Sequence, residues 1–310
     1  MARNRIIYQS QAVAVSGDAT SNTVVTIPGV QSVTYGIDVS REDVNHFGTV
    51  GAIDRIITEA PTATQEVQFH FPNGIITAGI LDLLVSGAFG NQTNGLIIGL
   101  DDEGVDFAET DQAANAVNLV SGRLSSFSFE ASVGGIPTVT LGFEGVALNY
   151  GKAYTIASPN DYSASLETFT DVTVTLVNGS LTHFTHAQSA TISFNLGSEG
   201  LQELGGSLVY ARVPTLPASV SLEVEGLAID KGMSLQLGGS FVTKASDSGD
   251  TDAGGRGNVS VAVGSVTFTL QNATLDAVSY TNSIGDNATC SATFSCSVGS
   301  ATSPSRLIIA

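Results

Sequence analysis

Short runs of alternating apolar and polar residues recur along the chain and predict β-strands. The clearest is ATCSATFSCSV at 288–298, in which every second residue from Cys290 to Cys296 is small or apolar. At roughly 3.3 Å per residue, such a strand holds its two cysteines about 20 Å apart and excludes a disulfide between them. We expect strands at 31–39, 53–58, 65–71, 123–133 and 137–149 in the first half, and at 190–196, 208–213, 220–227, 259–270, 273–280 and 289–298 in the second.

The segments between these strands favour an all-β fold with a minor α component. The last two runs of the first half are typical of a hairpin around Gly134 and Gly135. The one helix that we expect is TAGILDLLV at 77–85, which glycines flank and interrupt. Each half also contains a long excursion, at 87–117 and at 246–258, and loops of this length are usually functional.

The chain contains an internal repeat. QSVTYGIDVSREDVNHFG, beginning at Gln31, aligns with QSATISFNLGSEGLQELG, beginning at Gln188. Equivalent residues of the two segments are separated by the distance in sequence from Gln31 to Gln188, which we call the repeat offset. Nine identities fall in the 37 positions of 31–67, where ordinary amino-acid usage gives roughly two or three. Because the repeat offset is about half of the chain, the repeated unit is a whole domain. We therefore predict two tandem β-sandwich or β-barrel domains, at 1–157 and 158–310.

Composition limits the classes of function. Acidic residues number 29 against 11 basic ones, which gives a net charge of −18. A protein that grips nucleic acid needs lysine and arginine to displace counterions from phosphates, so tight DNA binding is disfavoured. The N-terminal residues lack the apolar core of a secretory signal, and no later run is long and apolar enough for a membrane span. We therefore expect a soluble protein without membrane partners.

Residues that carry chemistry form no recognisable set. His183 and His186 stand three residues apart, so on a strand they point to opposite faces. The acidic stretch DDEGVDFAETD at 101–111 has the oxygen ligands that calcium prefers, but its spacing is not that of an EF-hand. Gly254 to Gly257 lack the Lys-Ser/Thr pair of a phosphate cradle. We expect no metal, no cofactor and no enzymatic activity.

Two segments of the first half contain an ordered set of motifs. QSVTYGIDVSREDVNHFGTVGAIDRIITEAPTATQEVQFHF opens on a Gln-Ser strand, turns at Arg41-Glu42 toward Phe47-Gly48 and enters a strand at Arg55. RLSSFSFEASVGGIPTVTLGFEGVAL is a hairpin that ends in a Thr-Val-Thr-Leu-Gly strand. In this order and spacing, the motifs resemble the major tail tube proteins of tailed bacteriophages. The resemblance extends through the repeat to 188–224, and beyond it the second copy departs from the pattern, with no equivalent helix and a degraded hairpin.

The resemblance implies an assembly. Sheets of neighbouring subunits join edge to edge into a barrel around a lumen. Tubes of this family are built from rings of six domains, so two domains per chain imply trimeric rings with pseudo-sixfold symmetry, stacked head to tail. The implied partners are further copies of the chain, a tape-measure protein, tail terminator and baseplate proteins, and a sheath if the tail is contractile. DNA would pass through without tight binding, and the protein would assemble in the host bacterial cytoplasm and reside in the virion tail.

The repeat also selects candidate functional residues. Glu66 and Glu223 flank the repeated Val67 and Val224 and are candidates for acids that face the lumen. For the two repeated arginines, ordinary surface salt bridges are an equal alternative to contacts between subunits. The candidate contacts between subunits are Arg55, Arg212, Asp101, Asp102, Glu103 and Asp106.

A binding module is the main alternative to a tube subunit. Two β-sandwich domains also fit a phage adhesin or a capsid decoration protein. Aromatic residues at 7% and the absence of tryptophan disfavour stacking on glycans. An enzyme ranks third, because the sequence offers no catalytic constellation.

Overall fold

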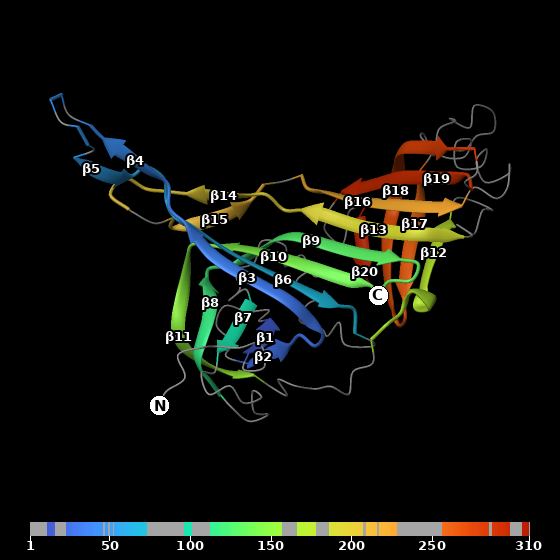
Figure 1. Ribbon diagram of the computed structural model, residues 1–310, viewed down its shortest axis with the longest axis horizontal. Helices are drawn as coiled ribbons and strands as arrows, with labels where there is room; N and C mark the ends of the chain where they lie inside the picture. The colour runs from blue at the N-terminus through green and yellow to red at the C-terminus, as the bar shows by residue number, and fades with distance from the viewer. Residues whose placement is uncertain are drawn as a thin grey trace.

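The part of the chain that the structure describes is built almost entirely from β-strands, which confirms the predicted all-β class (Figure 1). The computed structural model describes residues 11–15, 23–45, 47–48, 50–51, 53–72, 96–100, 112–156, 166–177, 186–206, 209–215, 217–227, 256–284, 287–297 and 306–309. The strands before the midpoint are β1 (Gln11–Val15), β2 (Thr23–Thr26), β3 (Val30–Asp38), β4 (Arg41–Val44), β5 (Asp54–Ile57), β6 (Thr62–His70), β7 (Leu96–Leu100), β8 (Gln112–Val120), β9 (Arg123–Ser132), β10 (Thr138–Gly145) and β11 (Ala147–Ile156). After the 3-10 turn η2 (Phe169–Asp171) come β12 (Val172–Val177), β13 (Ala187–Asn195), β14 (Ser198–Leu201), β15 (Ala211–Pro214), β16 (Ser219–Leu227), β17 (Arg256–Val263), β18 (Val266–Thr281), β19 (Thr289–Ser297) and β20 (Arg306–Ile309).

One large sheet runs through both halves of the chain. Its strand order is β12-β17-β18-β19-β16-β13-β9-β10-β6-β3, with β20 paired to β18. The halves meet where β13 pairs antiparallel with β9, from Ser189 opposite Ser132 to Asn195 opposite Ser126. The predicted domains are therefore joined by strand pairing, and their division at 157/158 lies outside the described residues.

The second half repeats the first in structure as well as in sequence. Strands β13, β14, β15 and β16 begin and end at the repeat offset from β3, β4, β5 and β6. The register repeats too, since Val33 lies opposite Val67 and Ala190 lies opposite Val224. These matches support the predicted duplication.

The hairpin β9–β10 also returns, as the later part of β18 with β19, at a slightly shorter spacing. Leu141 lies opposite Val67 in the first half, and Ala292 lies opposite Val224 in the second. Leu141 and Ala292 are therefore counterparts, and we call the spacing between them the hairpin offset. The hairpin that the sequence shows in degraded form is thus present in the second copy.

The halves differ in the layer behind the shared sheet. In the first half, β1-β2-β11-β8-β7 form a small closed barrel. In the second, β17 and the first part of β18 pair with β12 and β20. The departure of the second copy that its sequence predicts after 224 therefore corresponds to a different second layer.

A cluster of phenylalanines joins the two layers at the junction of the halves. Phe268 of β18 packs against Phe129 with ring centroids 5.4 Å apart and against Phe127 at 6.0 Å. Phe71 packs edge-on against both Phe129 and Phe268. Because these rings come from both halves and are almost fully buried, the halves share one hydrophobic core.

Several predicted boundaries are wrong for local reasons. Arg41 and Glu42 form no turn, because they begin β4, whose hairpin partner is β5. The predicted strand 137–149 breaks at Val146 into β10 and β11. The predicted strand 259–270 is two strands, because Gly264 adopts φ +56° and turns the chain between β17 and β18. Conversely, β18 runs without interruption through the break that we expected at 271–272.

Other predictions hold or fall outside the described residues. The hairpin of β9 and β10 turns at Gly134, which has φ +81°. Cys290 and Cys296 lie on one strand, β19, as buried free thiols, and burial raises the pKa of Cys296 to about 12. The predicted helix at 77–85 and most of both long excursions lie outside the described residues. Where the first excursion, 87–117, is described, the loop prediction is wrong, because β7 and the start of β8 lie there and pair with each other.

Because the two halves share one core, we expect them to unfold together. Phe268→Ala removes the ring that bridges the halves and should lower the free energy of unfolding by about 3–5 kcal/mol. Urea denaturation of the unassembled chain, followed by circular dichroism, should show one transition at a lower midpoint. Phe47→Ala is the control, because the Phe47 side chain is fully exposed and its loss should change stability by less than about 0.5 kcal/mol. Two separate transitions would contradict the shared core.

Candidate assembly surfaces

The pairing of β9 with β13 shows how one repeat joins the next. Phe127 and Phe194 lie opposite each other across this seam and stack with ring centroids 5.1 Å apart. The next core-facing pair along the same two strands, Phe129 and Ile192, is fully buried. The seam therefore combines backbone pairing with a dry aromatic contact behind the sheet.

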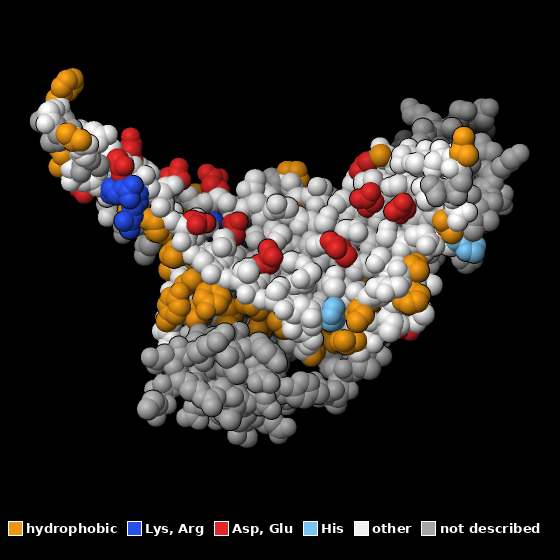
Figure 2. Space-filling model, viewed as in Figure 1, with side chains coloured by type: hydrophobic (Ala, Val, Ile, Leu, Met, Phe, Trp, Pro, Cys, Tyr) orange, Lys and Arg blue, Asp and Glu red, His pale blue; other side chains and the backbone are white. Residues whose placement is uncertain are grey.

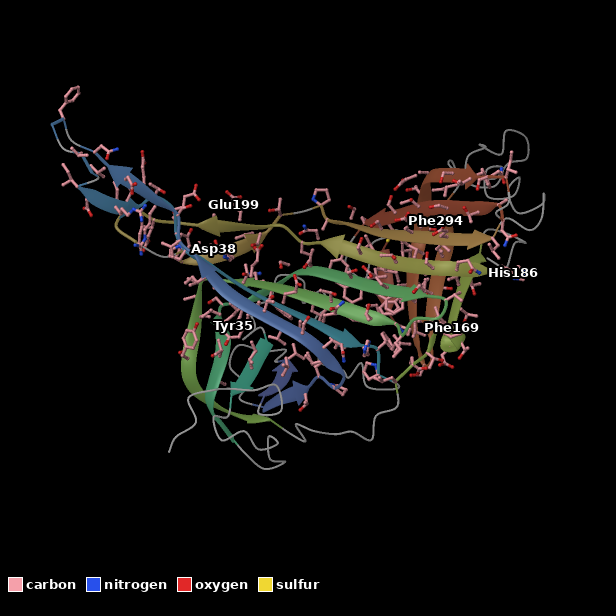
Figure 3. All side chains as sticks on the ribbon, in the orientation of Figure 1. Tyr35, Asp38, Phe169, His186, Glu199 and Phe294 are labelled. Carbon is pink, nitrogen blue, oxygen red and sulfur yellow. The ribbon has the colours of Figure 1, made fainter. Side chains whose placement is uncertain are left out.

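The β3 strand has the same sequence position as β13, but it is an open edge. It pairs with β6 on one side, and among the described residues no strand pairs with its other side. Tyr35 and Ile37, which correspond to Ile192 and Phe194, are 41% and 48% exposed, whereas their counterparts are 0% and 4% exposed. Tyr150 of the barrel strand β11 is exposed as well, and Figure 2 shows hydrophobic side chains gathered on the surface beside β3. Figure 3 shows Tyr35 on this outer strand.

A second open edge, which matches the first, lies in the second half of the chain, in the last part of β18. From Leu275 to Thr281, this strand pairs with β19, and no second strand of the described residues flanks that stretch. The hairpin offset makes Val278 and Tyr280 the counterparts of Phe127 and Phe129. Tyr280 is 43% exposed, and its pKa is raised by burial and then by Cys290. The molecule thus presents both halves of the seam, one at each end.

The front face of the shared sheet is polar and acidic. Serines, threonines and glutamates alternate outward with buried apolar residues along β6, β9, β13 and β16. Both candidate acids, Glu66 and Glu223, are exposed on this face, together with Glu130 and Glu225. Strands β3, β6, β10, β13, β16 and β19 contain no lysine or arginine. Acidic side chains are accordingly spread across the sheet in Figure 2, whereas basic ones gather on the hairpin at its upper left.

An open hollow on this face lies over the seam. Hydroxyl groups line it, among them Ser193 and Ser221, whose Oγ atoms are 2.9 Å apart. The described residues that line it include no histidine, cysteine, aspartate or glutamate. The hollow therefore supplies neither a general base nor a metal ligand set.

Two hairpins project from the same end of the sheet, one after β3 and one after β13. We call β4–β5 the first arm and β14–β15 the second arm. The second arm lies along the first half, whereas the first arm extends away from the molecule beyond β3 (Figure 1). In Figure 3, Asp38 marks the point where the first arm leaves β3, and Glu199 lies on the second arm.

The repeated arginines Arg55 and Arg212 occupy equivalent positions on these arms in opposite environments. The Arg212 guanidinium, 6% exposed, donates hydrogen bonds to Glu144 Oε2 at 3.2 Å and to Thr62 Oγ1 at 2.8 Å. Its Nη1 also donates to Ser198 Oγ at 3.0 Å. Arg55 is 68% exposed, and its guanidinium pairs only with Asp43 across its own hairpin among the interactions that the structure describes. Arg212 therefore fastens the second arm to the first half of the same chain.

A carboxylate pair lies at the junction before β12. Asp171 accepts hydrogen bonds from the Thr168 backbone N–H at 2.9 Å and from its hydroxyl at 2.7 Å, which lower the pKa of Asp171. Burial, followed by the charge of Asp171, raises the pKa of Glu167. Glu167 also joins the halves, because its backbone N–H donates to the Phe71 carbonyl at 3.0 Å. These contacts cap η2 and hold the segment before β12 against the first half.

Other candidate residues are not brought together. The acidic candidates Asp101, Asp102, Glu103 and Asp106 lie outside the described residues, as does His183. His186 precedes β13 and His70 ends β6. Within the described ranges no group of three or more metal-ligating side chains occurs, and no helix there is long and apolar enough to cross a membrane.

Sequence reasoning missed the two open edges. Tyr35 and Val278 lie in strands that it predicts, but nothing in the alternation distinguishes an edge strand from a central one. The repeat identifies Ile192 and Phe194 as the counterparts of Tyr35 and Ile37, but only the folded chain shows that the first pair of residues is buried and the second exposed.

No protein-family model matches the chain, and no curated protein matches it either.

The two arginines allow a matched test of these environments. Arg212→Ala should lower the free energy of unfolding by about 2–3 kcal/mol, because it removes charged hydrogen bonds at a nearly buried site. Arg55→Ala should cost less than about 1 kcal/mol, because the pair that it removes is exposed. Urea denaturation of the unassembled variants measures both, and equal losses would contradict the difference in environment.

Proposed function

We propose that this chain is a structural virion protein that polymerises into stacked rings and forms the tail tube of a bacteriophage. The observation that carries the proposal is the repeated seam. One complete β9–β13 seam lies inside the chain, and the two edges that would form a second seam are open at opposite ends. A chain built in this way is completed by another copy of itself.

The repeat specifies how two copies would pair. In the chain, Ile192 lies opposite Phe129 and Phe194 lies opposite Phe127. The repeat offset replaces Ile192 and Phe194 by Tyr35 and Ile37 of β3, and the hairpin offset replaces Phe129 and Phe127 by Tyr280 and Val278 of β18. In the same register, Tyr35 would therefore lie opposite Tyr280 of a neighbouring copy, and Ile37 opposite Val278. Both pairs would bury apolar side chains that the single chain leaves partly exposed.

Head-to-tail pairing of this kind closes a ring when the rotation from one copy to the next divides a full turn. The interface joins two different edges, so each added chain presents the same open edge again until the last one meets the first. Three chains supply the six domains of the rings in the family that the sequence resembles. Full closure also removes the exposed edges, which otherwise invite uncontrolled aggregation.

The acidic front face suits the wall of a DNA conduit. It carries Glu66, Glu130, Glu223 and Glu225 on strands nearly free of basic residues. This face offers DNA phosphates few lysines or arginines to replace their counterions, so the genome can slide without binding tightly. The proposed partners are further copies, DNA in transit, a tape-measure protein, terminator and baseplate proteins and, in a contractile tail, a sheath. The function needs neither an enzyme active site nor a cofactor.

Charge at the β3 edge should prevent assembly. Ile37→Arg places a guanidinium where the proposed seam buries an apolar pair, and should raise the concentration for half-maximal assembly at least about 30-fold, equivalent to about 2 kcal/mol. Negative-stain electron microscopy and light scattering of the purified protein measure rings, tubes and monomers.

The control for this variant is Thr34→Arg, on the same strand. Thr34 is exposed and lies opposite Glu66 on the polar face, so this change should leave rings intact. A wild-type protein that stays monomeric at all concentrations, or an Ile37→Arg variant that assembles normally, would contradict the proposed interface. Dispersed particles that bind bacterial cells or capsids would favour the adhesin or decoration protein instead.

Reversing charge on the conduit wall should hinder DNA. The double variant Glu66→Lys with Glu223→Lys adds cations that hold phosphates, so genome ejection from assembled particles should slow at least about tenfold at low salt, and less at high salt. Time-resolved release of DNA from purified virions measures the rate. An unchanged rate in intact tails would remove these two residues from the lumen.

A further inference from the structure

The first arm is a hairpin whose docking face has no partner within the described part of the chain. It forms a separate two-stranded sheet, and isolated hairpins of this size are marginally stable alone. Strand alternation places Arg41, Asp43, Arg55 and Ile57 on one side. Ile57 is 49% exposed there. An exposed, partly apolar hairpin face of this kind is typical of a contact surface.

The second arm shows what this face contacts. The two arms have the same backbone structure, since the Ile53 N–H donates to the Val44 carbonyl and the Tyr210 N–H donates to the Leu201 carbonyl at the repeat offset. On the second arm, Arg212 reaches Glu144 near the end of β10 and Thr62 at the start of β6. Both receiving residues belong to the preceding repeat, directly across the seam.

We propose that the first arm docks on the second half of the neighbouring copy, with Arg55 reaching Ser219 and Ser295 of that copy. The proposal rests on the proposed ring and adds a second contact to it. Ser219 corresponds to Thr62, because these residues begin the equivalent strands β16 and β6. Ser295 corresponds to Glu144, because Ser295 lies opposite Ser221 just as Glu144 lies opposite Thr64. The first arm projects beyond β3, on the side where this neighbour would lie (Figure 1).

The two contacts differ in which side supplies the carboxylate that pairs with the arginine. Inside the chain, the receiving surface supplies the acid, Glu144, and the arm has Gly200 opposite Arg212. At the proposed contact, the receiving surface has the neutral Ser295, and the arm supplies its own acid, Asp43, opposite Arg55. At these two pairs of equivalent positions, Glu144 with Ser295 and Gly200 with Asp43, each arginine therefore has one carboxylate, taken from a different side of the interface.

This exchange of the acid makes each arm specific for one half. A first arm placed on a Glu144 surface would bring two carboxylates to one guanidinium, with repulsion between like charges. A second arm placed on a Ser295 surface would leave its nearly buried guanidinium without a carboxylate. The arms thus favour rings in which first and second halves alternate.

The test moves the acid from the arm to the receiving surface. Asp43→Gly should raise the concentration for half-maximal ring formation at least about tenfold, because Arg55 loses its carboxylate in the interface. Ser295→Glu alone should also weaken assembly, because a second acid meets Asp43. The double variant Asp43→Gly with Ser295→Glu rebuilds the set found inside the chain, and should return assembly to within about threefold of the wild type. Light scattering and negative-stain microscopy supply the concentrations and ring dimensions.

The matched control is Glu42→Gly, which lies on the opposite side of the same strand. Its effect should not be reversed by Ser295→Glu. Thermal unfolding of the unassembled variants checks that each chain folds. If the wild type forms rings and the effects of Asp43→Gly and Ser295→Glu simply add, the arm contact is wrong and the proposed function stands. If the wild type forms no rings, the proposed function fails and the arm contact with it.

Discussion

Backbone pairing at strand edges governs how this chain folds and what its surface offers. The edge of a sheet exposes a row of backbone N–H and C=O groups that can form hydrogen bonds with another strand. In this chain the pairing of β9 with β13 satisfies one such edge, and the phenylalanines behind it exclude water. The same arrangement leaves β3 and the end of β18 open. A chain that repeats such a domain therefore presents at its two ends the edges that it has already joined in its middle.

Divergence between the two copies fits a chain that combines a permanent seam with the proposed reversible one. Phe127 and Phe194 stack in the internal seam, whereas Val278 and Ile37 occupy the equivalent positions at the open edges. The smaller side chains bury less apolar area, so a seam between chains would be weaker than the internal seam. The arms differ in the same direction, because the arginine of the internal contact, Arg212, is nearly buried, whereas Arg55 is exposed.

The two faces of the large sheet divide the tasks of stability and surface chemistry. One face packs valines, leucines and phenylalanines into a core that spans both halves. The other carries hydroxyls and carboxylates, and its strands are nearly free of basic residues. Because side chains alternate between faces, a single strand such as β6 contributes Val67 to the core and Glu66 to the acidic surface.

Reading the residues in order was enough to establish the all-β class, the position of most strands of the large sheet and the repeat offset, because alternation and self-similarity are both visible along the linear chain. It also placed Glu66 and Glu223 at equivalent positions. It missed the barrel strands β1, β2, β7 and β8. Which strands are neighbours emerged from the folded chain alone, since alternation specifies the face of a side chain and not its partner across the sheet. For the same reason only the fold distinguishes Arg212, which is enclosed by Glu144 and Thr62, from Arg55, which is exposed at the same position in the repeat. Burial depends on what the rest of the chain places nearby, and residues far apart in sequence supply it.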